Sequence, residues 1–178
     1  LQTRGHFDAK VEIQKETTPE TLQVIYQISP GALHKLVLLE ITGNKKFLDT
    51  RKLRSYLQIQ SASRFLSHGR YSEALLKGDV ATLEGLYRAS GFREVQIQTK
   101  VDDDYQGAEN RLAVHIHIEE GVRTLVGEVH VAGGQKIAAD ELPELSTQPG
   151  QPYSEQELAN DRERILNFYF DHGFPNAS

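Results

Sequence analysis

Hydrophobic and polar residues alternate along two short stretches near the start of the chain, which is typical of strands with one buried face. Val11 and Ile13 are flanked by charged or amide side chains, and apolar residues occupy every other position of 22–28. Residues 17–20, Thr-Thr-Pro-Glu, are turn-forming. The pattern predicts the end of a helix followed by a β-hairpin within residues 1–31.

A helical period follows in the middle of the chain. Apolar side chains recur three or four residues apart from Leu76 to Tyr87, which predicts an amphipathic helix. Ser72 is a candidate N-cap in front of this helix. Gly91 is placed where a helix ends in a left-handed residue, and Phe92 can fold back over the last turn.

The same stretch occurs twice. Residues 71–95 recur as 153–177, with a shared Tyr-Ser-Glu start, a matched Asp, a matched Tyr and a matched Gly-Phe. Residues 21–31 likewise correspond to 111–121. Internal repetition of this kind decides the architecture.

Around this repeat the patterns predict a strand at 37–41, a short helix at 49–57 and strands at 93–101 and 112–118. The repeating unit is therefore β-α-α-β-β. We predict that 1–31 is the C-terminal part of a unit, that 32–121 is a complete unit and that 122–178 is an N-terminal part. The last part should hold a strand around 129–131, a short helix at 140–145 and a long helix at 154–172.

Composition narrows the class of protein. The 178 residues carry a net charge of −5 and no cysteine. The chain therefore lacks the basic footprint of a nucleic-acid partner, and it can form neither disulfides nor thiolate zinc sites. No apolar run approaches the ~20 residues that span a bilayer. A chain that begins at Leu1 rather than Met is expected to be a processed chain or a fragment.

Candidate chemistry is sparse. His115 and His117 point to one face of a strand and could bind a metal with Glu119, but a solvated strand face is the favoured interpretation. The acidic run 102–104 lacks the spacing of a calcium loop and predicts a turn. Because no acid/base constellation is recognisable, we expect neither catalysis nor a cofactor.

The repeat resembles the POTRA (polypeptide-transport-associated) family. The features that carry the resemblance are a strand ending in a (Val/Ile)-x-Gly turn, Tyr-Ser before the long helix, Leu-x-x-x-Tyr-x-x-x-Gly-Phe across its end, and a Gly closing the unit. The strand turn lies at 41–43 and 131–133, and Tyr-Ser lies at 71–72 and 153–154. The helix-end motif lies at 83–92 and again at 165–174, where Ile replaces the first Leu. The closing glycines are Gly31 and Gly121. The chain departs from the pattern at Gly5-His6-Phe7, with an extra residue before the aromatic, and no membrane barrel follows.

The resemblance implies an α+β fold of tandem modules, each a three-stranded mixed sheet covered on one face by two antiparallel helices. It implies the periplasmic side of the outer membrane of a Gram-negative bacterium, with anchoring by a C-terminal barrel absent from this chain. Its implied partners are unfolded outer-membrane or secreted polypeptides, accessory assembly proteins and neighbouring POTRA modules.

If the third strand of the unit is central, as in the family, the second strand is an edge that can accept an extended polypeptide by β-augmentation. An edge guarded against aggregation by its charged side chains is the competing interpretation. The predicted client-binding edge strand consists of Arg93, Glu94, Val95, Gln96, Ile97, Gln98, Thr99, Lys100 and Val101.

Several alternatives stay open at this point. The chain could be the arm of a dedicated two-partner secretion transporter, or a structural connector that only spaces proteins across the periplasm. The partial units 1–31 and 122–178 could complete one another in a head-to-tail or swapped assembly, or they could result from truncation.

Overall fold

The computed structural model describes residues 5–132 and 141–177. Contacts divide the chain into two compact units. The first unit contains Leu1–Leu83 and Ile97–Glu119, and the second contains Glu84–Gln96 and Glu120–Ser178.

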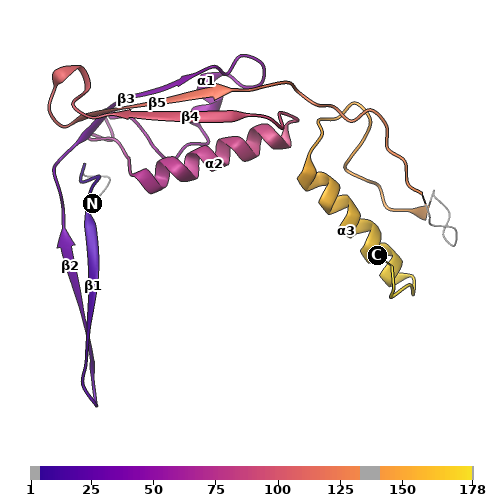
Figure 1. Cartoon of the computed structure of the whole chain (residues 1–178), viewed down its shortest axis with the longest axis horizontal. Helices are drawn as coiled ribbons and strands as arrows, with labels where there is room; N and C mark the ends of the chain where they lie inside the picture. The colour runs from indigo at the N-terminus through magenta and orange to yellow at the C-terminus, as the bar shows by residue number, and fades with distance from the viewer. Residues whose placement is uncertain (1–4, 133–140, 178) are drawn as a thin grey trace. The chain divides into compact units, whose positions relative to one another are not determined.

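The first unit is built on a three-stranded sheet of β3 (Lys35–Thr42), β4 (Gln96–Asp102) and β5 (Arg111–Glu119), in the order β3-β5-β4 (Figure 1). β3 and β5 run parallel, although they are far apart in sequence. β5 follows β4 after a short connection that contains the 3-10 turn η2 (Tyr105–Gly107). The predicted α+β class and the three-stranded mixed sheet are confirmed, and β5 is the central strand.

One face of this sheet is buried and the other is open to solvent. In β5 the apolar residues Leu112, Val114, Ile116 and Ile118 are buried, whereas His117 between them is exposed. Helix α2 (Glu73–Ala89) runs alongside the sheet in Figure 1 and contributes buried leucines to the core. The short helix α1 (Thr50–Arg54) adds Leu53, which is fully buried.

β3 departs from a simple alternation of faces. Leu36, Leu39 and Ile41 are buried, whereas Val37 is intermediate, so the buried positions do not alternate strictly. The cause is a register shift in the ladder with β5 between Leu36 and Leu38. An extra residue at such a bulge exchanges the two faces of the strand, so that Leu36 and Leu39 both point into the core.

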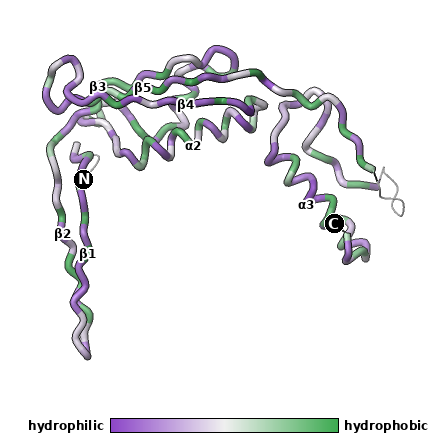
Figure 2. Tube along the Cα trace, in the orientation of Figure 1, coloured by the Kyte–Doolittle hydropathy of each residue, from purple (hydrophilic) through white to green (hydrophobic). Residues whose placement is uncertain are grey.

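A separate two-stranded antiparallel sheet is formed by β1 (Lys10–Thr17) and β2 (Leu22–Ser29), as the hairpin pattern predicts. The turn between them is closed by the Thr18 amide, which donates to the Thr21 carbonyl at 2.8 Å. Figure 2 shows hydrophobic residues interspersed with polar ones along both strands. The ladder places Val11 beside Ile28 and Ile13 beside Tyr26 on one face, and all four side chains are at least half exposed.

The ends of α2 follow the predicted capping chemistry. The Ser72 hydroxyl accepts a hydrogen bond from the Leu75 amide at 3.2 Å. At the other end Gly91 has φ +93°, and the Phe92 amide donates to the Tyr87 carbonyl at 3.0 Å. The two rings meet edge to face, with centroids 5.6 Å apart. Glycine is required at this position because a side chain there would be strained by the left-handed backbone.

The second unit repeats these features around α3 (Glu155–Asp171). The Ser154 hydroxyl caps the helix by accepting from the Glu157 amide at 3.3 Å. After the helix, the Phe174 amide donates to the Tyr169 carbonyl at 3.0 Å, and the two rings lie edge to face. The helix predicted at 154–172 is thereby confirmed.

Two other predictions for 122–178 are not met in the described residues. Residues 129–131 are not assigned to a strand, and the described strand contact of this segment is a single bridge between Leu125 and Pro152. A strand needs a partner, and the described part of 122–178 contains no counterpart of β5 to pair with it. Of the short helix predicted at 140–145, residue 140 lies outside the described residues, Glu141 has a 3-10 conformation and 142–145 are not helical. The helix end predicted at the start of 1–31 falls on residues outside the described ones.

The Asp matched in both repeats has a structural role that the sequence pattern did not reveal. Asp79 on α2 is 1% exposed, and its carboxylate accepts hydrogen bonds from the backbone amides of Gln58 and Ile59 at 2.8–3.0 Å. Asp161 on α3 does the same for two successive amides, those of Ser146 and Thr147. Each carboxylate therefore ties its long helix to the loop that precedes it.

The charge environment of Asp161 favours its ionised form. Burial acts to raise the pKa of this carboxyl, but the amide hydrogen bonds and the Arg164 guanidinium outweigh burial and hold the pKa below its usual value. The bond between this helix and its loop is therefore present above the ordinary pKa of an aspartate. It is lost only when the pH falls through the lowered value.

Replacing the buried carboxylate should destabilise the fold selectively. We expect Asp79→Asn to lower the free energy of unfolding by about 1–3 kcal/mol, because an amide NH₂ would face two backbone N–H donors. Asp49→Asn is the matched control, since Asp49 caps α1 by accepting from the Lys52 amide and Asn caps a helix as well as Asp. Urea unfolding followed by circular dichroism measures both, and equal losses in the two variants would contradict the assignment.

The glycine after α2 offers a second matched pair. A Cβ at Gly91 would lie 2.5 Å from the Thr124 carbonyl oxygen, whereas a Cβ at Gly85, inside the helix, meets nothing within 4 Å. Gly91→Ala should therefore cost about 1–3 kcal/mol of stability, and Gly85→Ala should add about 0.5–1 kcal/mol. Thermal unfolding of the two variants tests this, and a neutral Gly91→Ala would show that the turn is not constrained.

Candidate strand-binding edge and groove

The sequence-predicted edge strand is an edge of the sheet, but it begins later than predicted. β4 starts at Gln96 and extends to Asp102. Residues 93–95 belong instead to the turn after α2, where the Val95 amide donates to the Phe92 carbonyl and the Val95 side chain is 4% exposed. Of the predicted site, only positions 96–101 can therefore present strand backbone.

The opposite edge of the sheet, β3, is closed by the chain itself. The Leu36 amide donates to the His68 carbonyl at 2.9 Å, and the Ala62 amide donates to the Leu36 carbonyl at 2.7 Å. The Arg54 guanidinium also donates to the Leu39 carbonyl. Because backbone groups of β3 are already paired with the loop 60–70 and with α1, this edge cannot take an added strand along its length.

β4 differs from β3 in this respect. Among the backbone hydrogen bonds outside the ladders that the described residues make, none involves 96–102. The strand is paired with β5 on one side only, as the strand order requires. Its outward amides and carbonyls are therefore available to an extended polypeptide, which can add to the sheet as a fourth strand.

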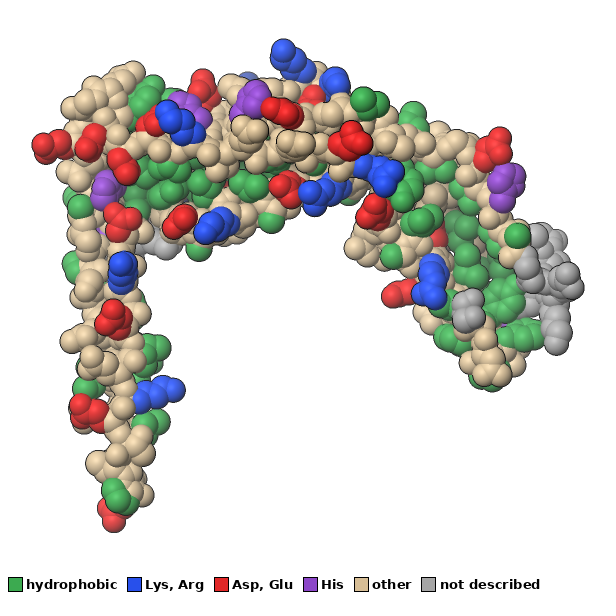
Figure 3. Space-filling model, viewed as in Figure 1, with side chains coloured by type: hydrophobic (Ala, Val, Ile, Leu, Met, Phe, Trp, Pro, Cys, Tyr) green, Lys and Arg blue, Asp and Glu red, His purple; other side chains and the backbone are tan. Residues whose placement is uncertain are grey.

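A groove of about 870 Å³ lies beside this edge. Thr99 and Val101 of β4 form one wall, Leu76 and Val80 of α2 form the other, and Leu112 contributes from β5. Figure 3 shows hydrophobic side chains gathered between β4 and α2 in this part of the molecule. Alternate side chains of a strand added to β4 would point into this groove, which we call the β4 groove.

One end of the β4 groove is lined by aromatic and charged residues. Phe7 and Tyr71 meet edge to face there, with ring centroids 5.6 Å apart. Burial, followed by the charges of Glu73, Asp103 and Asp8, raises the pKa of Tyr71. The phenol is therefore neutral at physiological pH and can donate a hydrogen bond to a ligand in the groove.

The other face of the sheet is polar. His115 lies between two carboxylates, with its Nδ1 2.7 Å from Glu40 and its Nε2 3.3 Å from Asp102. The Lys100 ammonium, 2.7 Å from Asp102, is the main cause that lowers the pKa of that carboxyl, and His115 adds to it. His117 contacts the Thr42 hydroxyl at 2.9 Å. The prediction that both histidines face the polar side is confirmed.

The described residues contain neither a candidate metal centre nor a helix suited to spanning a membrane. Residues 5–132 and 141–177 hold no group of three or more His, Asp or Glu side chains arranged to bind a metal ion. Within the same ranges, no helix has the length and the apolar character that crossing a membrane requires. Glu119, the third candidate ligand, takes no part in the His115 cluster.

Sequence reasoning located the edge and missed the groove beside it. The apolar stripe of α2 predicted only a core helix, yet its residues Leu76 and Val80 also line the β4 groove. The repeated Tyr at 71 and 153 was a usable signal, because an aromatic residue retained in front of both long helices suggests a contact common to both copies.

Comparison with known proteins is consistent with this architecture. Residues 38–121 and 124–178 match the POTRA family, described as surface antigen variable number repeat. The chain is 27% identical over 185 residues to the outer membrane protein assembly factor BamA of Neisseria meningitidis serogroup B (strain ATCC BAA-335 / MC58), covering 98% of this chain. It is 22% identical over 175 residues, 96% of this chain, to a protein of Treponema pallidum (strain Nichols) named as an outer membrane protein assembly factor. The chain spans 21% of the length of each of these relatives.

Among solved structures, the crystal structure of POTRA3-5 of Haemophilus influenzae BamA is similar, with a TM-score of 0.54 and 18% identity. The match covers 95% of this chain and 65% of that one. At this level of identity the similarity concerns the fold.

Proposed function

Because the chain belongs to the POTRA family, we propose that it is a periplasmic arm of an outer-membrane protein assembly or translocation factor, and that it binds unfolded client polypeptides by strand addition at β4. The arm is non-catalytic and works on the periplasmic side of the outer membrane of a Gram-negative bacterium. Accessory assembly proteins and neighbouring POTRA modules are its further partners.

The observation that carries this proposal is the difference between the two edges of the sheet. β3 is paired with its own chain, whereas β4 makes no backbone hydrogen bond outside the ladder among the described residues. Backbone hydrogen bonds ignore most of the sequence of the added strand, which suits a receptor for many clients. Each bond contributes only about 1 kcal/mol net, so that clients exchange readily.

The β4 groove supports a preference for amphipathic clients. Side chains on one face of an added strand would enter the groove beside Val101 and Leu76, and those on the other face would extend past the polar face that carries Lys100 and His115. A strand with alternating apolar and polar residues fits both environments at once. Strands of membrane barrels have this alternation.

The proposal predicts where a client perturbs the backbone. Titration of the isotope-labelled chain with an unfolded barrel-strand peptide should shift the amide resonances of 96–102 in a saturable manner. The amides of 35–42 on the closed edge serve as an internal control and should stay in place. Shifts confined to residues outside β4 would contradict binding at this edge.

Neighbouring positions on β4 provide a matched pair of variants. Thr99 lines the groove, whereas Gln98 points to the opposite face, and both are exposed. Thr99→Lys places a charge in the groove and should weaken peptide binding by at least about tenfold. This factor corresponds to the free-energy cost of burying a polar group without a hydrogen-bond partner. Gln98→Lys adds the same charge outside the groove and should change the affinity less than threefold, on the scale of a weakly coupled surface charge. Equal effects in fluorescence anisotropy would rule out the groove as the binding surface.

Two alternatives are distinguished by the range of clients. A dedicated arm of a two-partner secretion transporter would bind one secreted polypeptide and reject unrelated barrel peptides. A structural connector would bind none of them, and β4 would then be an edge protected only by its charged residues.

We further propose that 32–121 is one complete POTRA module, that 1–31 is the C-terminal part of another and that 122–178 is an N-terminal part. The hairpin supports this assignment, because Val11, Ile13, Tyr26 and Ile28 form an apolar face with at least 52% exposure each. In the complete module the corresponding face of β5 is covered by α2. Helix α3 repeats the sequence pattern of α2, so α3 of a second copy is a fitting cover for the hairpin.

Head-to-tail or swapped pairing of this kind predicts concentration-dependent association. Sedimentation velocity should show the weight-average mass rising with concentration, and Tyr26→Lys should return the chain to the monomer. Glu12→Lys is the control, because Glu12 lies on the other face of the hairpin. A monomer at every concentration would exclude pairing between copies and leave the strand-addition proposal untouched.

A further inference from the structure

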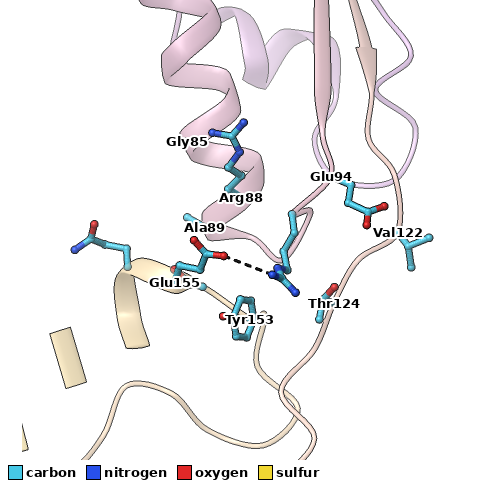
Figure 4. A pocket seen from close by; sticks show the side chains of 11 residues that line it. Gly85, Arg88, Ala89, Glu94, Val122, Thr124, Tyr153 and Glu155 are labelled. Atoms are coloured by element: carbon cyan, nitrogen blue, oxygen red, sulfur yellow. Dashed lines mark ion pairs between the residues drawn. The ribbon is translucent and has the colours of Figure 1, made fainter. Parts of the chain in front are cut away.

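The second unit contains an arginine contact that neither the edge strand nor the core requires. The Arg93 guanidinium lies over the Tyr153 ring, with its Cζ 4.8 Å from the ring centroid. One of its nitrogens is 3.5 Å from a Glu155 carboxylate oxygen, the ion pair drawn as a dashed line in Figure 4. Arg93 lies in the turn after α2, and Tyr153 and Glu155 lie at the start of α3, so the contact links the end of one long helix to the start of the next.

A second arginine makes the reverse contact. Arg123, at the start of the second repeat, donates from Nε to the Ser90 carbonyl at 3.0 Å, near the C-terminal end of α2. Its Cζ lies 5.9 Å from the centroid of the Phe92 ring. Each repeat therefore contributes one arginine to an aromatic ring of the other, and Arg123 also satisfies a carbonyl left without a partner by the end of the helix.

Backbone hydrogen bonds hold the same segments in register. The Thr124 amide donates to the Gly91 carbonyl at 2.8 Å, and the Tyr153 amide donates to the Thr124 carbonyl at 3.0 Å. This close approach needs glycine at 91, since a Cβ there would collide with the Thr124 oxygen. The segment around Thr124 thus lies between the α2 turn and the residues that begin α3.

The first unit contains the same joint with different side chains. The His34 amide donates to the Gly5 carbonyl at 2.8 Å, and a Cβ at Gly5 would lie 2.5 Å from the His34 oxygen, the distance found between Gly91 and Thr124. Phe7, two residues after this glycine, packs on Tyr71, as Arg93 packs on Tyr153. The backbone arrangement is therefore common to both joints, and the first uses a buried aromatic pair where the second uses an arginine.

We propose that Arg93 and Arg123 form a reciprocal, salt-sensitive latch within the second unit, which holds the turn after α2 against the segment that begins the second matched repeat, 124–178. The backbone contact between Gly91 and Thr124 brings the two segments together, and the two arginines restrain them there. This inference does not depend on client binding. It assigns a role to residue 93 different from the strand role that the sequence suggested.

The strength of the latch should change with the salt concentration. The side chains of Arg93 and Glu155 are 52% and 75% exposed, so their ion pair is weakened by salt. The stacking of a guanidinium on an aromatic ring depends less on salt than the ion pair does. It requires arginine, because only the guanidinium offers a flat stacking surface. At the Gly5 joint the corresponding contact is between the uncharged rings of Phe7 and Tyr71, and that contact should depend less on salt.

Distance measurement between spin labels tests the latch directly. The chain has no cysteine, so Gly85→Cys in α2 and Glu163→Cys in α3 give two exposed labelling sites within the second unit, one on each side of the latch. We expect a narrow distance distribution in the otherwise unchanged chain and loss of that narrow distribution in Arg93→Ala/Arg123→Ala. Arg93→Lys should lie between them, because lysine keeps the charge and loses the flat stacking surface.

The control variant is Arg88→Ala. Arg88 is close to the joint but pairs with Glu84 of its own helix at 3.1 Å, so its removal should leave the distribution narrow. Circular dichroism melting of each variant separates loss of the latch from loss of the fold. A distribution as narrow in the double variant as in the parent chain, or one already broad in the parent, would overturn the proposal.

Discussion

The carboxylate of Asp79 connects the core of the first unit to the loop that closes one edge of its sheet. It is buried on α2 and accepts hydrogen bonds from the amides of Gln58 and Ile59, where that loop begins. The loop then pairs with β3 through Ala62 and His68. A buried charge is tolerated only when it is hydrogen-bonded, so the helix and the loop must stay together. This constraint leaves β4 as the edge with unpaired backbone.

An asymmetric sheet has a functional consequence. A small sheet with two open edges would invite uncontrolled pairing with other chains, and a sheet with two closed edges could accept no client. Under the strand addition proposed above, closing β3 and leaving β4 open would direct the client to a single side. The β4 groove, lined by α2, would then give the added strand one apolar environment and one polar one. In that proposal, recognition depends on the packing of α2 as much as on the strand.

Much of this fold follows from local patterns in the sequence. The hairpin, both long helices and their stops were predictable, because alternation, helical spacing and a left-handed glycine such as Gly91 act over a few residues. The central position of β5 came from the resemblance to a family and not from any local pattern. The bulge at Leu36 and the start of β4 at Gln96 depend on how strands pair at long range, which no short window of sequence contains.

The candidate site was predictable only in part for the same reason. Residues 96–101 are at the edge as expected, but the groove is formed by residues from five segments that meet only in the folded unit. Arg93 was assigned to the strand because it precedes an alternating pattern, whereas its guanidinium packs on Tyr153, sixty residues further along the chain. Asp79 was visible as a repeated residue, yet its partners are backbone amides, which have no signature in a sequence.

The central claim is that a client pairs with β4 in the geometry of a sheet. The most direct measurement is isotope-filtered nuclear Overhauser spectroscopy on the labelled chain with a bound barrel-strand peptide. Our account predicts cross-strand contacts between backbone protons of the peptide and those of 96–102, accompanied by slower amide exchange along that strand. Contacts with β3, or with the side chains of α2 and no strand backbone, would contradict it.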